Sequence, residues 1–355
     1  MEKLYSIQYL RACAALLVVV AHAFSHQIGV DNPFIVLAGR LGVVLFFVIS
    51  GFIMVYISGT GPFSPIIFLK RRIIRIVPLY WLFTGAAALL AALAPGLLKT
   101  TVFTWPHFIQ SLLFIVHEAP GRGGTSPLLS LGWTLNYEAF FYVAFAALAF
   151  MAATSRIVAL TALFIATWLA GLIVTPVDPI LQFYLNAAPL AFAVGAWIGW
   201  RRLKGEFRPD AWKGWALAGL ALAGGCLALV DDGRPLTAQI SIAGQLIWAV
   251  GIVVTALMFE AKLKRSSLLE QLGDSSYALY LSHMFAIGAV TAITRRTLGT
   301  EGTGTMILTC MVCVVLACIA GIAIHRFIEK PILRLINGRG RPAGEPFGPL
   351  APAAK

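Results

Sequence analysis

A histidine and an arginine lie within the first long apolar segment of the sequence, where titratable side chains are rare. Arg11 and His22 are eleven positions apart, which on a helix places them within ~20° of one face and ~16 Å apart along the axis. Because a titratable residue inside an apolar span usually faces the protein interior or a cavity, His22 is a candidate for proton transfer. The alternative for His22 is a hydrogen-bonded core histidine, and for Arg11 an anchor at the membrane surface.

Two arginines precede the third apolar segment. Arg72 and Arg75 are three positions apart, so their guanidinium groups share one face of a helix. Such a pair suits the bidentate recognition of phosphate. Composition alone favours the alternative, in which both are ordinary positive charges at the end of a membrane span.

An isolated acidic residue, Glu138, lies in the aromatic-rich stretch 133–142. A carboxyl group inside a span needs a partner, and His22 lies at a comparable depth if both segments cross the membrane. The alternative is one hydrogen-bonded glutamate within an interfacial aromatic belt. His283 and His325 are weaker candidates, for which a structural role is the more common outcome.

Composition places most of this chain in a lipid bilayer. Hydrophobic residues make up 59% of the 355 residues and charged residues only 12%, too little polar surface to cover a globule of this size. We therefore predict an all-α, polytopic membrane helix bundle with about ten spans, each of the ~20 residues that cross the hydrocarbon. The first span is expected to be retained, since it is too long for a signal peptide. The expected spans are 7–27, 37–57, 77–93, 133–152, 157–174, 181–200, 215–230, 240–259, 277–294 and 305–324.

Basic residues gather in alternate connections between these spans, near residues 70–75, 156, 201–213 and 262–265. By the positive-inside rule, these connections and both termini are expected in the cytoplasm. Arg295 and Arg296 are an exception, because they fall on the outer side. The net charge of +12 follows the span ends and forms no single stripe, which argues against a nucleic-acid partner.

The longest connection, 94–131, contains the apolar segment 105–117, which is too short to span and is expected to form an interfacial or re-entrant helix on the outer side. The five cysteines lie in apolar runs and are expected to be small packing residues. We expect a single transmembrane domain over residues 1–336. A disordered cytoplasmic tail, rich in Gly, Pro and Ala, is expected over residues 337–355.

Six short motifs, in this order, resemble those of the acyltransferase-3 family of integral-membrane acyltransferases, and most closely its exopolysaccharide O-acetyltransferases of the succinoglycan type. Each motif alone is weak, but together they cover about residues 6–331 and make a strong family signal. They are Arg11 with His22 after ten intervening residues, Leu-Phe-Phe-Val-Ile-Ser-Gly-Phe at 45–52, Arg72 and Arg75 before Pro78, Trp-Thr-Leu-Asn-Tyr-Glu at 133–138, Ser-Tyr-Ala-Leu-Tyr-Leu-Ser-His at 276–283, and Glu-Lys-Pro at 329–331.

The resemblance implies transfer of an acyl group, commonly acetyl, from cytoplasmic acyl-CoA to a hydroxyl of a cell-surface or lipid-linked polysaccharide, at the inner membrane of a bacterium. It implies that His22 is the catalytic base and that Glu138 is a second catalytic residue, which could orient the imidazole as a carboxylate does in a triad. The expected donor-binding residues are Arg72, Arg75, Arg11 and His283, and no metal is expected. Tyr137 stands where many members have a second acidic residue, which puts a mechanism with two carboxylates in doubt.

Two other classes of protein fit the same composition. A transporter or flippase of a lipid-linked sugar would use intramembrane His and Glu as relay or binding groups, but no symmetry between two halves of the chain is evident. A scaffold for polysaccharide assembly would have no catalysis. Transfer of an acyl group by the purified protein separates the enzyme from both.

Overall fold

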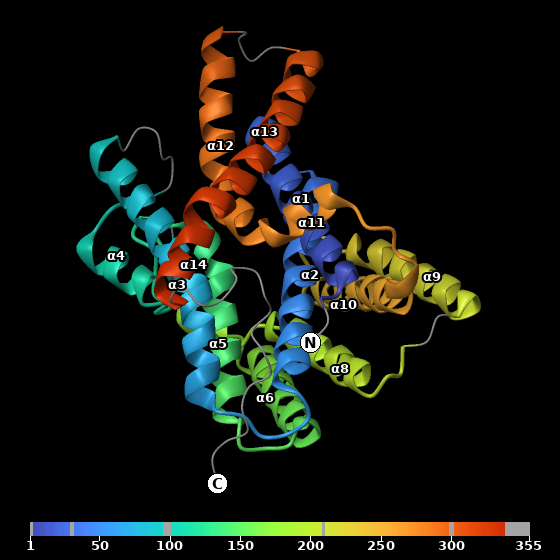
Figure 1. Ribbon diagram of the computed structural model, residues 1–355. Helices are drawn as coiled ribbons and strands as arrows, with labels where there is room; N and C mark the ends of the chain where they lie inside the picture. Colours follow the sequence, from blue (N-terminus) through green and yellow to red (C-terminus); the bar gives the residue numbers. More distant parts are fainter. Residues whose placement is uncertain are drawn as a thin grey trace. The chain divides into compact units, whose positions relative to one another are not determined.

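The computed structural model of this chain describes residues 3–28, 32–94, 101–121, 123–207, 210–297 and 302–337. Within these ranges the chain forms helices and connecting turns, and no strand occurs (Figure 1). The predicted all-α fold is confirmed. The predicted disordered tail lies, from residue 338 on, outside the described residues.

Eight helical segments in the described ranges are long and apolar enough to cross a bilayer, and each overlaps a predicted span, although the one predicted at 77–93 begins at Pro65. The segment Pro179–Leu203 comprises α7 (Pro179–Tyr184) and α8 (Pro189–Leu203). The last segment comprises α13 (Thr303–Ile324), a π-helical turn (His325–Glu329) and most of α14 (Lys330–Asn337). The eight are α1 (Tyr5–Ile28), α2 (Pro33–Ser58), α3 (Pro65–Leu93), α6 (Ala153–Val174), Pro179–Leu203, α10 (Pro235–Met258), α12 (Ser276–Thr297) and Thr303–Ile336.

The other two predicted spans, 133–152 and 215–230, contain shorter helices. α5 (Trp133–Ala147) has 15 residues. Its length is therefore ~22 Å, less than the ~30 Å of the hydrocarbon core. α9 (Ala211–Ala228) has 18 residues. Both segments are helical as predicted, but α5 ends at Ala147 and not at residue 152.

The helices form two compact units, one of residues 1–49 with 204–335 and one of residues 50–203 with 336–355. α2 contributes to both, because its residues up to Ile49 belong to the first unit and those from Ser50 to the second. The single transmembrane domain over 1–336 stays a prediction.

In the first unit, α1, α12 and α13 pack through small and aliphatic side chains. Ala15 and Val19 of α1 meet Leu279 of α12 and Ala317 of α13, and none of the four has exposed surface. At Gly321 the backbone of α13 approaches α12 so closely that a Cβ would lie 2.7 Å from Cβ of Leu279. This packing fixes the faces of α1 and α12 that carry His22 and His283.

The start of α1 is held by acidic groups of the same unit. Glu260 accepts the backbone N–H groups of Tyr5 and Ser6 at 2.7 and 2.9 Å. A carboxylate at a helix N-terminus satisfies unpaired N–H groups and complements the helix dipole. Lys3 adds ion pairs with Glu270 at 2.5 Å and Asp274 at 3.3 Å, both on α11 (Ser267–Asp274). The amino-terminal end of α1 is therefore anchored.

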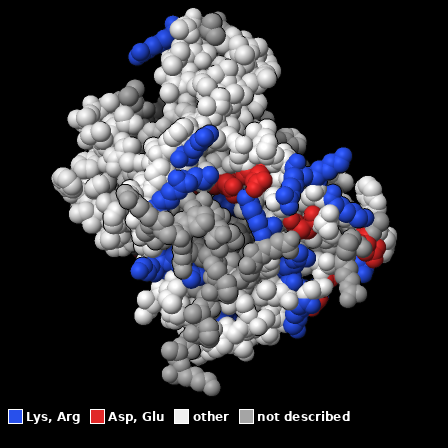
Figure 2. All heavy atoms as spheres, viewed as in Figure 1, with Lys and Arg blue, Asp and Glu red and all other residues white. Residues whose placement is uncertain are grey.

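The exposed surface of α12 and α13 is apolar. Ile293, Met311, Val315 and Ile319 are each more than half exposed. Figure 2 shows few charged side chains over these two helices. Exposed apolar surface of this extent is typical of contact with lipid.

The second unit has an aromatic core around a buried arginine. Arg156 has no exposed surface and donates hydrogen bonds to the carbonyl oxygens of Gly61 at 2.8 Å, Met151 at 2.6 Å and Leu148 at 3.3 Å. Its guanidinium carbon lies 4.4 Å from the centroid of the Phe63 ring, a cation–π contact. The connection that carries Arg156 was expected in the cytoplasm, which stays a prediction, and the structure shows that the side chain of Arg156 is buried within the protein. Because it binds the carbonyls of residues 148 and 151, it also explains the early end of α5.

The predicted short helix in the connection 94–131 is α4 (Trp105–Leu112), with 8 residues. Trp105, Ile109 and Leu113 form an exposed apolar stripe, whereas His107 and Ser111 are buried. A short helix with one apolar face exposed is typical of a membrane interface. On its buried side, Nδ1 of His107 lies 2.6 Å from Nε2 of a second buried histidine, at position 117, and burial together with that neighbour lowers the pKa of His107 to about 4.

All five cysteines are free thiols. Cys310 and Cys313 are buried and Cys318 is half-buried, as expected for small packing residues. Cys13 and Cys226 are exposed on α1 and α9, so packing within the protein does not account for them.

The predicted topology is tested by labelling in intact cells. In a variant without native cysteines, Ser126→Cys should react with a membrane-impermeant maleimide, because the positive-inside rule places the connection 94–131 outside. Lys204→Cys, in an exposed position after α8, should react only after the membrane is permeabilised. Labelling of Lys204→Cys in intact cells would refute the topology.

Candidate functional site

His22 of α1 and His283 of α12 lie side by side in the first unit. The distance from Nδ1 of His22 to Nε2 of His283 is 3.3 Å, and the ring centroids are 5.0 Å apart. His283 is fully buried, and its Nδ1 lies 2.7 Å from the carbonyl oxygen of Tyr280. Nδ1 of His22 also lies 2.9 Å from the carbonyl oxygen of Val18, and His22 is half-buried.

These contacts determine where the ring hydrogens lie. A carbonyl oxygen only accepts, so Nδ1 of His283 must donate to Tyr280, which leaves Nε2 of His283 as an acceptor. Nδ1 of His22 then donates to the carbonyl oxygen of Val18 and, over a longer distance, to Nε2 of His283. The lone pair of His22 is therefore on Nε2. In the described part of its own unit, this atom has no hydrogen-bond partner, which is the state of an imidazole ready to accept a proton.

Within this unit, the groups next to Nδ1 of His22 are the Val18 carbonyl oxygen and Nε2 of His283. Sequence reasoning gave the role of a triad's carboxylate to Glu138 and treated His283 as the weaker candidate. Leu279 and His283 are one helical turn apart, and this spacing gives no sign of the contact between the two histidines. His22 and His283 are 261 residues apart in the sequence. Only the packing of α1 against α12 brings the two rings together.

Glu138 of α5 is the centre of a polar group in the second unit. Its Oε1 accepts hydrogen bonds from Ser50 of α2 at 2.9 Å and from Tyr142, one turn further along α5. Arg72 of α3 is 7% exposed and lies close enough to Glu138 and Tyr142 to interact with both electrostatically. A buried guanidinium thus has a carboxylate beside it, as buried charges normally require.

The sequence pointed to Arg72 and Glu138 separately, and the structure brings them together. It did not point to Ser50 or Tyr142 as partners of Glu138. A signal for Tyr142 was present, since it follows Glu138 by four positions and so lies on the same helix face.

The remaining predicted arginines lie apart from these two groups along their helices. Arg75 is half-buried, one turn beyond Arg72 on α3. Arg11 is half-buried on α1, three turns before His22, and its Nη1 donates to Oε1 of Gln8 at 3.2 Å.

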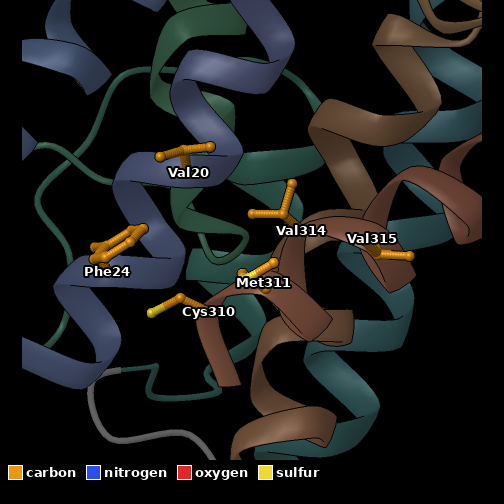
Figure 3. A pocket seen from close by; sticks show the side chains of 6 residues that line it. All are labelled: Val20, Phe24, Cys310, Met311, Val314 and Val315. Atoms are coloured by element: carbon orange, nitrogen blue, oxygen red, sulfur yellow. The ribbon is translucent and has the colours of Figure 1, made fainter. Parts of the chain in front are cut away.

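An open hollow between α1 and α13 has only apolar walls (Figure 3). Its volume is 310 Å³, and Val20 and Phe24 of α1 face Cys310, Met311, Val314 and Val315 of α13 across it. Val20 and Phe24 each lie two positions from His22, which puts them ~160° round the helix from it. This hollow is therefore on the opposite side of α1 from His22.

Comparisons with known proteins bear on the family. The chain is 38% identical to the exopolysaccharide production protein ExoZ of Rhizobium meliloti (strain 1021) over 309 residues, which is 85% of this chain and 92% of that protein. It is 26% identical to the acyltransferase MdmB of Streptomyces mycarofaciens over 375 aligned positions, 96% of this chain and 94% of that protein. No solved structure matches the chain. Residues 4–324 match the acyltransferase-3 family, whose description is an acyltransferase domain, and the chain therefore belongs to this family of acyltransferases.

Proposed function

We propose that this protein transfers an acyl group, most simply acetyl, from acyl-CoA in the cytoplasm to a hydroxyl of an exopolysaccharide or its lipid-linked precursor. The family supplies the reaction type, and the name of the relative from Rhizobium meliloti supports a polysaccharide acceptor. The apolar helices support a location in the bacterial cytoplasmic membrane. The observation that carries the proposal is the His22–His283 pair, which leaves Nε2 of His22 as a proton acceptor.

In the proposed reaction, Nε2 of His22 removes the proton from the acceptor hydroxyl as its oxygen attacks the thioester carbonyl. The tetrahedral intermediate collapses with cleavage of the C–S bond, and the proton passes from His22 to the thiolate of CoA. The products are the acyl ester and free CoA, so atoms and protons balance. His283 and the Val18 carbonyl hold the imidazole in the required tautomer and accept from its Nδ1–H when the ring becomes cationic.

Glu138 remains a proposed site residue because of the side chains that it contacts. Its carboxylate offsets the charge of the Arg72 guanidinium, which would otherwise be costly to bury. Oε1 accepts from two hydroxyl groups, so Oε2 remains for a further donor. We assign Glu138 to the catalytic machinery on this basis, with Arg72, Arg75 and Arg11 as the residues that bind the anionic donor.

The donor-binding role of the arginines predicts a loss of affinity without a loss of insertion. Arg75→Lys keeps the positive charge that fixes topology but removes the guanidinium fork, so the Kd for acetyl-CoA should rise roughly 10-fold. Arg72→Lys should weaken binding similarly and also lower the thermal stability, because Arg72 interacts with Glu138 and Tyr142. Equilibrium binding to purified protein measures the first effect and a thermal unfolding scan the second.

The matched control is Arg201→Lys, the same change at an exposed arginine at the end of α8. It should leave the Kd for acetyl-CoA unchanged. An unchanged Kd in Arg75→Lys and Arg72→Lys as well would make both residues ordinary charges at a span end.

The function itself is tested by transfer. Purified protein in nanodiscs, supplied with labelled acetyl-CoA and exopolysaccharide from a strain that lacks the gene, should produce labelled polysaccharide. Release of label by mild alkali identifies an ester. Movement of a lipid-linked sugar across the bilayer without incorporation of label would favour a flippase.

A further inference from the structure

A histidine and a glutamate after α13 pair with each other and leave one polar atom each unbonded. In the π-helical turn His325–Glu329, Nδ1 of His325 lies 2.7 Å from Oε2 of Glu329. Nε2 of His325 and Oε1 of Glu329 are buried, and neither has a hydrogen-bond partner in the described ranges. The side chain of Glu329 is only 2% exposed. Because buried polar atoms are normally hydrogen-bonded, two such atoms on one pair call for a further polar partner.

The local backbone supports this interpretation. A π-helical turn widens the helix by one residue and occurs frequently at functional sites. α12 packs against this turn, and its first residue, Ser276, is fully buried with no partner for its Oγ in the described part of the chain. The turn and the start of α12 are therefore in contact, and both carry buried polar atoms that lack a hydrogen-bond partner in the described part of the chain.

The pair presents two groups with defined chemistry. A carboxylate only accepts, so Nδ1 of His325 is the donor to Glu329, and Oε1 of Glu329 remains as an acceptor. When the pair is ionised, Nε2 of His325 carries a hydrogen and is a donor. An acceptor beside a donor is complementary to an amide group or to the amino edge of adenine, each of which has an N–H next to an acceptor.

The position along the helices relates this pair to His22. Sγ of Cys310 donates to the carbonyl oxygen of Ala23 at 3.6 Å, which places Cys310 of α13 level with His22 of α1. His325 follows Cys310 by fifteen positions, which is ~22 Å along the helix. Since Ala317 also meets Ala15, the helices are antiparallel, and His325 lies towards the amino-terminal end of α1. That separation is of the order of the length of CoA from its thioester to its nucleotide.

We propose that the His325–Glu329 pair is a further binding site, which recognises the amino edge of the adenine base of acyl-CoA while the thioester lies at His22. Both pantetheine amides lie in the arm close to the thioester, so the group of acyl-CoA that reaches this distance is the adenine base. This inference rests on the proposed function, since it takes acyl-CoA as the donor.

The test is equilibrium binding of acetyl-CoA to purified full-length protein. Glu329→Gln replaces the acceptor and donor pattern of the pair with little change in volume, and the Kd for acetyl-CoA should rise roughly 10-fold. His325→Asn keeps an N–H that can reach Glu329 but removes Nε2, and should have a similar effect. It also provides a second variant if Glu329→Gln does not fold. Glu118→Gln, at an exposed position in the connection after α4, is the matched control and should bind as the wild type does.

A second ligand tests the assignment to the adenine base. S-Acetyl-phosphopantetheine retains the amides and lacks the adenine nucleotide. Glu329→Gln should weaken the binding of acetyl-CoA and leave the binding of S-acetyl-phosphopantetheine unchanged, whereas equal weakening of both ligands would overturn the assignment to adenine. Folded variants that bind acetyl-CoA as tightly as the wild type would overturn the inference. A wild-type protein that binds no acetyl-CoA would instead refute the proposed function.

Discussion

Replacement of His22 by alanine is expected to reduce acyl transfer to background while the protein still inserts and binds acetyl-CoA. A general base contributes ~10²–10⁴-fold to rate, and Nε2 of His22 is the proton acceptor that the His22–His283 pair leaves available. The measurement is transfer of labelled acetyl from acetyl-CoA to polysaccharide in membranes, normalised to protein level. His26→Ala, one turn further along α1, is the matched control and should retain most of the activity.

A second substitution separates proton transfer from hydrogen bonding. His22→Gln supplies an amide that can still donate to Val18 but cannot take up the hydroxyl proton, so it should not restore activity. Normal insertion and normal acetyl-CoA affinity in both variants would show that only the chemical step is lost. Substantial transfer by His22→Ala at normal protein level would remove the base from this residue.

The spans were predictable because a hydrophobic run of the right length is a local property of the sequence. Each of the eight candidate spans in the described ranges overlaps a predicted one, and the short helix before His117 was predicted from its apolar character and its length. The end of α5 was not, because it depends on Arg156, which reaches back to the carbonyls of Leu148 and Met151. A basic residue near a span end looks the same in the sequence whether it faces water or is buried.

The candidate site was predictable in its parts and not in its pairings. His22 and Glu138 stood out because a titratable group inside an apolar span is costly. The partners of His22 and Glu138 could not be predicted from the sequence. Similar depth in the membrane allows many possible pairs, and the packing of the helices determines which of them form. In their own units, His22 contacts His283, and Glu138 contacts Ser50 and Tyr142. His325 and Glu329 are the case that spacing could have shown, because they are four positions apart on one helical segment.

The role of His283 leads to the second large effect. If His283 positions His22 by accepting a hydrogen bond from its Nδ1–H, replacing His283 with a residue of similar volume that has no acceptor should allow the His22 imidazole to adopt other tautomers and orientations. His283→Phe should therefore lower kcat by up to ~10⁴-fold, the effect of losing the orienting group of a triad, with little change in the KM for acetyl-CoA. A purely structural role would instead lower protein level or thermal stability and leave kcat per folded molecule unchanged.

His283→Gln is the informative companion, because its Oε1 can lie near the position of Nε2 and accept from His22. It should retain clearly more activity than His283→Phe although both replace a fully buried ring. The double variant His22→Ala with His283→Phe should be little slower than His22→Ala alone, because the effects of substituting two residues that act as one unit are not additive. Multiplicative losses of activity in the double variant would mean that His283 serves the reaction independently of His22, for example through contact with the donor.

Equal activity of His283→Phe and His283→Gln would show that the hydrogen bond from His22 to His283 is not the basis of the effect of His283 on activity. The comparison therefore tests the contact between Nδ1 of His22 and Nε2 of His283, on which the proposed tautomer of the base depends.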